Sequence, residues 1–253
     1  MKKIVVRVAL AILVLFLVIS LGFVAYTRLK TASPEPEALA ALESTDNVEV
    51  TTDDWLVFIP REAEPTTGLI IYPGGLVDPR AYAPLARDIA AQGYLVAIVP
   101  MPFNLAVFGS GKGSDVIASF PSVETWAIGG HSLGGAMGSR FARQNPSDIS
   151  GLALWAAYPA GSDDLSDSAL AVTSIYGTLD GVATTEEIED SRSLLPTDSV
   201  FVPIDGGNHS QFGWYGPQSG DNPAAISHAE QQSQIVAATV ALLERLELRE
   251  LAP

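Results

Sequence analysis

From residue 47 onward, short apolar runs alternate with longer stretches of mixed character. The short runs are rich in Val, Ile and Leu and are bounded by Gly, Pro or polar residues, as buried strands are. The longer stretches repeat their apolar residues three and four positions apart, which is typical of amphipathic helices. This alternation predicts a layered α/β fold with a mostly parallel central sheet and helices on both faces.

The pattern is clear enough to place each element on the chain. The expected strands are residues 48–51, 55–59, 68–72, 94–99, 125–128, 152–156, 172–176 and 200–204. The expected helices are residues 79–92, 114–120, about 133–143, 185–195 and 225–246. The stretch between residues 100 and 122 is otherwise irregular.

One apolar segment precedes this pattern. Residues 8–27 form an uncharged run of 20 residues, long enough to cross a bilayer as a helix. Its basic flanks are Lys2, Lys3 and Arg7 before the run and Arg28 and Lys30 after it. A cleaved signal peptide is the alternative, but the run lacks a convincing pair of small residues at a cleavage site. An uncleaved membrane anchor is therefore favoured over a secreted protein.

The basic flanks also suggest how the anchor is oriented. With the free amino group added, the N-terminal flank is the more positive, which predicts a cytoplasmic N-terminus and an extracytoplasmic domain. The expected organisation is an anchor at residues 1–30, a linker or surface helix at 31–46, and one folded domain at 47–253. The length of the chain fits one domain of this size.

Charge and composition then exclude several classes of function. Residues 31–253 carry 9 basic and 29 acidic side chains, a net charge of 9 − 29 = −20. Such a domain repels nucleic acid and favours a neutral or cationic ligand. The chain has no cysteine, so disulfides, thiolate zinc sites and a cysteine nucleophile are excluded.

A candidate nucleophile lies between an expected strand and helix, in the sequence Gly-His-Ser-Leu-Gly at 130–134. A sharp strand-to-helix turn holds a serine in a strained conformation and exposes its hydroxyl, and flanking glycines relieve the crowding. The following helix N-terminus favours the negative charge that develops in acyl transfer. We therefore expect Ser132 to be the nucleophile.

A serine hydroxyl needs a base, and the chain has three histidines. His131 adjoins Ser132 on a tight turn, where neighbouring side chains point apart, so it is expected to pack or to orient its neighbours. His228 lies near the start of the last helix, which suggests a solvated or capping role. His209 follows the last strand in a Gly-rich loop, where strand ends gather. We expect His209 to be the base.

The base in turn needs an acid to hold its tautomer. Asp180 follows the strand at 172–176 and should emerge at the same edge of the sheet as His209. The chain order Ser132, Asp180, His209 is the one expected of this arrangement. The rivals are Asp205, Glu186 and Glu187.

An oxyanion hole needs two backbone donors. The first is expected to be the amide of Leu133, directly after the nucleophile. The second should come from the turn after the strand at 68–72, where Gly75 or Leu76 is the donor. The sequence does not choose between them.

These motifs resemble the α/β-hydrolase superfamily across nearly all of residues 47–246, and in particular its compact members without a cap, related to dienelactone hydrolases. The motifs are Gly-His-Ser-Leu-Gly-Gly at 130–135, Tyr-Pro-Gly-Gly at 72–75, Gly-Thr-Leu-Asp-Gly at 177–181 and Gly-Gly-Asn-His at 206–209. Dienelactone hydrolases carry a cysteine where this chain has Ser132. The segment at 210–216 resembles a bacterial subgroup that is often membrane-attached.

The resemblance implies hydrolysis of a small-molecule ester, with no cofactor and no metal. The short intervals between the expected strands leave little room for a separate lid, so we expect an open site. The same fold also hosts acyltransferases and other acyl chemistry. Transfer of an acyl group to an envelope glycan or lipid is therefore one alternative, and a non-catalytic envelope binding module is another.

Overall fold

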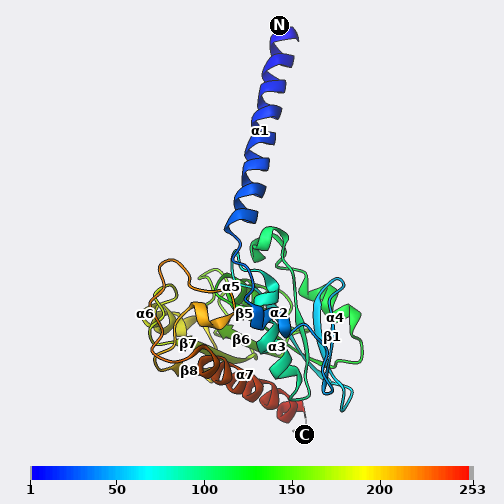
Figure 1. Cartoon of the computed structure of the whole chain (residues 1–253), viewed down its shortest axis with the longest axis vertical. Coiled ribbons are helices and arrows are strands. Elements are labelled where there is room, and N and C mark those ends of the chain that lie inside the picture. Colours follow the sequence, from blue (N-terminus) through cyan, green and yellow to red (C-terminus); the bar gives the residue numbers. More distant parts are fainter. Residues whose placement is uncertain (1, 251–253) are drawn as a thin grey trace. The chain divides into compact units, whose positions relative to one another are not determined.

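The computed structural model of the chain describes residues 2–250, which divide into two units after residue 31. The first unit is one continuous helix, α1 (Lys2–Lys30). Within the described residues, it is the helix long and apolar enough to cross a membrane. The second unit contains the sheet and its covering helices (Figure 1).

The second unit is built on one sheet of eight strands, in the order β1-β2-β4-β3-β5-β6-β7-β8. The first two strands pair antiparallel, β2 is antiparallel to β4, and all other neighbours are parallel. The strands are β1 (Val48–Thr51), β2 (Leu56–Pro60), β3 (Thr67–Tyr72), β4 (Leu95–Ile98), β5 (Thr125–His131), β6 (Gly151–Trp155), β7 (Ala171–Gly177) and β8 (Val200–Ile204). The mostly parallel sheet predicted from the sequence is confirmed.

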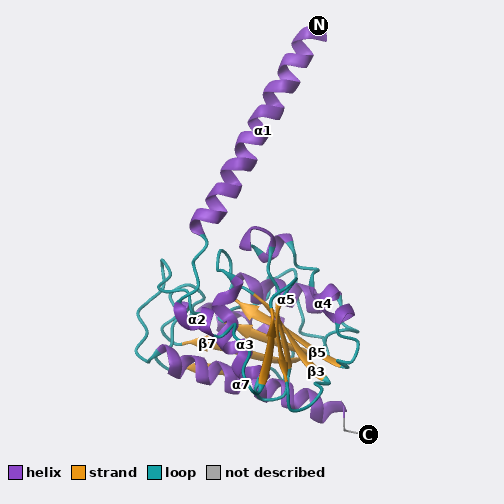
Figure 2. Cartoon of the chain, turned by 45° about the vertical axis from the view of Figure 1, so that its right-hand side comes forward, coloured by secondary structure: helices purple, strands orange, loops and turns teal. Residues whose placement is uncertain are grey.

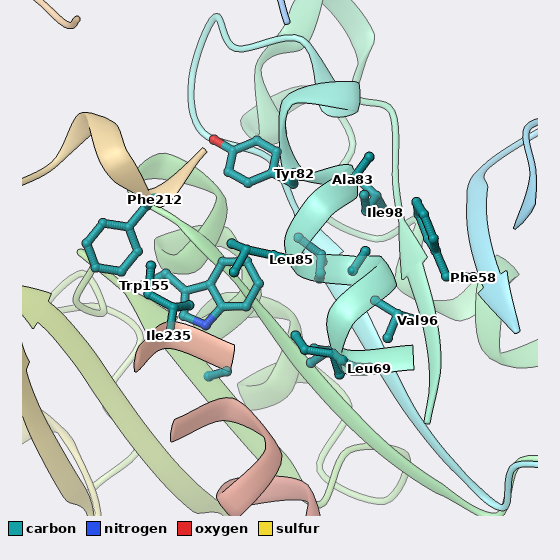
Figure 3. Close-up of a cluster of buried hydrophobic side chains, with 14 of the residues drawn as sticks. Phe58, Leu69, Tyr82, Ala83, Leu85, Val96, Ile98, Trp155, Phe212 and Ile235 are labelled. Atoms are coloured by element: carbon teal, nitrogen blue, oxygen red, sulfur yellow. The ribbon is translucent and has the colours of Figure 1, made fainter. Parts of the chain in front are cut away.

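Helices cover both faces of the sheet, because the central strands are apolar on both faces. On one face lie α3 (Ala83–Ala90) and α7 (His228–Glu250), and on the other lie α4 (Gly113–Ser119) and α5 (Leu133–Gln144) (Figure 2). Successive residues of β3 alternate between the two cores: Leu69 packs in the first and Ile70 in the second. Figure 3 shows Leu85 of α3 in the first core, with Leu69 and Trp155 from the sheet.

Three expected helices have different bounds. The helix expected at 79–92 is a 3-10 helix, Pro79–Tyr82, followed by α3, because Pro84 has no amide hydrogen and fits only the first turn. The helix expected at 185–195 is α6 (Thr185–Asp190) followed by the 3-10 helix Ser191–Leu194. The last helix begins at His228 rather than 225, since Ser227 caps it by accepting the amide of Glu230.

The segment expected as a linker or a surface helix is packed onto the rest of the second unit from Ala32 onward. It contains a short helix, α2 (Pro36–Ala40), and the side chains of Ala38 and Ala41 are buried. The amide of Glu35 donates to the carbonyl of Trp214, and Ala32 bridges to Val77. Residues 32–46 are therefore part of the same compact unit as the sheet, not a free tether.

Candidate active site

Ser132 lies in the turn between β5 and α5, with a left-handed backbone (φ 52°, ψ −122°). Its amide donates to the carbonyl of Trp155 at the end of β6, at 3.0 Å. The turn packs on the end of β3 so closely that a Cβ at Gly130 or Gly134 would lie 2.2 or 2.0 Å from the carbonyl oxygen of Tyr72. The glycines of the motif are thus required by the approach of two backbones.

Asp180 and His209 come from the loops after β7 and β8, and their side chains are fully buried. Asp180 Oδ2 lies 2.8 Å from Nδ1 of His209, while its Oδ1 accepts the amides of Val182 and Ala183, both at 2.7 Å. A carboxylate only accepts, so Nδ1 donates, and in the neutral ring the lone pair is on Nε2. Nε2 of His209 is buried and makes no hydrogen bond within residues 2–250.

The rival acids have other partners. Asp205 accepts a hydrogen bond from the hydroxyl of Thr178 at 3.3 Å. Glu187 forms a capping box with Thr184 at the start of α6, and Glu186 is exposed in the same turn. Asp180 is therefore the candidate acid that the structure brings to His209.

Asp221 is a residue of this site that the sequence did not indicate. Its Oδ1 accepts the amides of Gly181 and His209, both at 3.2 Å, and its Oδ2 accepts the amide and hydroxyl of Ser210 at 2.8 and 2.9 Å. One carboxylate therefore joins the turn that carries Asp180 to the loop that carries the histidine. The only local signal was an Asp followed by Asn and Pro, which predicts a turn and nothing more.

The two expected oxyanion donors of the turn after β3 differ in their surroundings. The amide of Leu76 donates to the carbonyl of Asn104 at 2.7 Å, so it is engaged within the fold. A Cβ placed on Gly75 would lie 3.1 Å from Cδ2 of Leu133. Gly75 therefore adjoins Leu133, whose own amide, in the first turn of α5, has no acceptor within the helix. This arrangement favours Gly75 over Leu76 as the candidate for the second oxyanion donor.

His131 is buried behind this turn and packs against aromatic rings. The hydroxyl of Tyr82 accepts the amide of Gly74 at 3.0 Å and is hydrogen-bonded to Nδ1 of His131 at 2.9 Å. The ring of His131 stacks on Phe212 and lies 4.4 Å, centroid to centroid, from the ring of His209. Burial, and then the nearby His209, hold the pKa of His131 well below its ordinary value, which keeps the ring neutral.

His228 is half-buried, and the residue that caps α7 is Ser227 rather than His228. Its ring stacks on Trp214, with ring centroids 3.8 Å apart and planes 14° apart. Burial lowers the pKa of His228 from 6.5 to about 4.

One cavity lies far from these residues. It has a volume of about 720 Å³ and adjoins the amino ends of β5, β6 and β7. None of the candidate catalytic residues lines it. Within residues 2–250, no three His, Asp or Glu side chains are grouped as metal ligands would be.

Comparisons with known proteins support the α/β fold and the resemblance to hydrolases. A family model described as the alpha/beta hydrolase family matches residues 68–233. A hydrolase from Thermoplasma acidophilum, described as predicted and CIB-like, superposes with a TM-score of 0.55 at 15% identity, over 78% of this chain and 97% of the other. An esterase from Pyrobaculum calidifontis superposes with a TM-score of 0.62 at 17% identity, over 89% of this chain and 91% of the other.

At these identities, the two structures show a shared fold. A comparison with curated proteins found no match. The family model spans most of the second unit, including the turn at Ser132 and the loops of Asp180 and His209. The chain therefore belongs to the alpha/beta hydrolase family.

Proposed function

We propose that the chain is a serine hydrolase that cleaves carboxylic esters of small molecules, with Ser132, His209 and Asp180 as its triad. The observation that carries the proposal is the buried hydrogen bond between Asp180 and His209, which leaves Nε2 of the ring as a base. The strained turn at Ser132 supports the same assignment, since strain of this kind is found at functional sites.

In the proposed mechanism, Nε2 of His209 takes the proton from the Ser132 hydroxyl as its oxygen attacks the ester carbonyl. The amides of Leu133 and Gly75 stabilise the oxyanion, and α5 adds the favourable field of its N-terminus. The imidazolium then protonates the leaving alcohol, and an acyl-Ser132 ester remains. Water, deprotonated by His209, cleaves this ester, releases the acid and restores the serine.

The connection between β6 and β7 supports an open site. Residues 156–170 contain no helix, so they form no helical lid. The negative charge of the domain favours a neutral or cationic ester over an anionic one. No cofactor takes part in the proposed reaction.

We further propose that α1 is an uncleaved anchor that spans a cell membrane, with the second unit on the extracytoplasmic side. The length and apolar character of the helix support a membrane span. Three basic residues before the apolar run, against two after it, support the orientation.

Labelling with a fluorophosphonate probe tests the nucleophile. The full chain should react, and Ser132→Ala should abolish labelling, whereas Ser119→Ala, an exposed serine at the end of α4, should leave labelling unchanged. Persistent labelling of Ser132→Ala would refute the assignment. A chain that neither labels nor hydrolyses p-nitrophenyl esters would be a binding module, and product that forms only with an added acyl acceptor would indicate a transferase.

A further inference from the structure

The loop between β4 and α4 carries large apolar side chains that are about half exposed. Phe103 is 43% exposed, Val107 47% and Phe108 54%. The two phenylalanine rings meet edge to face, with centroids 5.6 Å apart. We call residues 102–108 the apolar loop. A patch of exposed large apolar side chains next to a functional site commonly marks a surface for a partner or a membrane.

The apolar loop is joined to the candidate oxyanion turn. The carbonyl of Asn104 accepts the amide of Leu76, and Cδ2 of Leu105 lies 3.7 Å from where a Cβ of Gly75 would be. Phe103 and Asn104 both have positive φ, 58° and 54°, which costs about 1–2 kcal/mol for a residue such as Phe. The backbone of the apolar loop is therefore strained near its start, at the exposed Phe103.

The same turn also receives the chain from its amino-terminal side. The amide of Ala32 donates to the carbonyl of Leu76 at 2.8 Å, and the amide of Asp78 donates to the carbonyl of Ala32. Ala32 follows Lys30, the last residue of α1, by two positions, and two residues span at most about 7 Å. If α1 spans a membrane, Leu76 is therefore held close to the membrane surface. The apolar loop is held there too, because Asn104 is hydrogen-bonded to Leu76.

The apolar loop also differs from the rest of the domain in its charge. No acidic residue occurs between Asp88 and Asp115, although residues 31–253 carry 29 of them. The apolar loop lies within this stretch, and the one charged side chain in the stretch is Lys112. An acidic domain repels anionic lipid headgroups, and this region lacks that repulsion.

We propose that the apolar loop docks into the surface of the lipid bilayer that anchors the chain, and that the site acts on amphiphilic acyl esters held at that surface. The substrate class rests on the proposed esterase function, and the docking rests on the proposed anchor. In this arrangement, Val107 and Phe108 lie among the headgroups and outer acyl chains, beside the turn that carries Gly75. An ester in the bilayer reaches Ser132 without complete transfer into water.

Spin labelling tests the docking without any measurement of activity. The chain has no cysteine, so Val107→Cys gives a single nitroxide site in the full chain, reconstituted in phosphatidylcholine vesicles. Val200→Cys on β8, 40% exposed, is the matched control. The label at 107 should be accessible to oxygen and shielded from a water-soluble nickel complex, and the label at 200 the reverse. Equal access of the nickel complex to both labels would overturn the docking.

Kinetics test the substrate class. The double variant Val107→Ser, Phe108→Ser should hydrolyse a long-chain ester in vesicles about tenfold more slowly or worse, because two apolar anchors are lost. Its rate on water-soluble p-nitrophenyl acetate, and both rates of Val200→Ser, should be unchanged. Unchanged rates on both esters, or equal losses on both, would overturn the proposal. A wild-type chain inactive on every ester would overturn the esterase function, while the spin-label result would still decide the docking.

Discussion

The carboxylate of Asp180 binds the ring of His209 with one oxygen and its own turn with the other. Oδ2 lies 2.8 Å from Nδ1 of the histidine, and Oδ1 accepts two backbone amides at 2.7 Å each. Both side chains are inaccessible to solvent. The orientation of the carboxylate, and with it the tautomer of the ring, is therefore fixed by the fold.

Asp180→Asn should reverse this tautomer. The two amides of Val182 and Ala183 require an acceptor, so the carbonyl of the new side chain replaces Oδ1 and its NH₂ group faces His209. Nδ1 then accepts, Nε2 carries the proton, and the ring no longer deprotonates Ser132. The kcat for p-nitrophenyl acetate should fall by about 10,000-fold, with the melting temperature checked by circular dichroism. A variant that retains most of the activity would contradict the role of Asp180.

Asp221→Asn should displace the base without unfolding the domain. Its NH₂ group would face backbone amides that now donate to a carboxylate oxygen, so the loops of Gly181 and His209 move apart. We expect kcat to fall on the order of 10- to 100-fold with KM nearly unchanged. Asp205→Asn is the control, because Asp205 lies in the loop that carries His209 and its hydrogen bond within residues 2–250 is with the Thr178 hydroxyl. Equal kinetics of the two variants would exclude a positioning role for Asp221.

Two glycines of α5 should respond in opposite ways to alanine. At Gly134, a Cβ would lie 2.0 Å from the carbonyl oxygen of Tyr72, so the turn at Ser132 must shift, and stability should fall by about 1–3 kcal/mol or more. At Gly138, the nearest atom is 3.6 Å away, and alanine should be neutral or stabilise the helix by up to about 1 kcal/mol. Urea unfolding of both variants measures the difference. Equal stabilities would disprove the tight approach at Gly134.

Acid should destabilise the fold through His228 and His131, whose pKa values are lowered in the folded chain. The pKa of His228 is about 4 in the folded chain against 6.5 ordinarily, so below pH 6.5 the unfolded state binds a proton that the folded state does not. The free energy of unfolding therefore falls as pH decreases from about 6.5 towards 4, and His131 acts in the same direction.

His228→Phe isolates this effect. Phenylalanine keeps a ring over Trp214 but does not titrate, so the variant should lose less stability than the wild type between pH 7 and pH 4.5. Urea unfolding at both pH values is the measurement. An identical pH dependence in the two proteins would show that His228 is not held neutral in the folded state.

The sequence alone determined the order and type of most elements, the mostly parallel sheet and the serine turn, although not the bounds of every helix. The period of apolar residues distinguishes strand from helix, and the glycines around Ser132 are required by local backbone geometry. His209 and Asp180 were identified as candidates because parallel strands end at one edge of the sheet, which is a consequence of topology. The long apolar helix at the amino-terminal end also follows from local composition.

Only the tertiary structure decided the partners of these residues. Gly181 and Asp221 are 40 positions apart, and nothing local relates them. The engagement of the Leu76 amide by Asn104, and the stacking of His228 on Trp214, likewise join distant segments. Hydrogen bonds and ring contacts depend on distances of a few tenths of an ångström, and packing of the whole domain sets those distances.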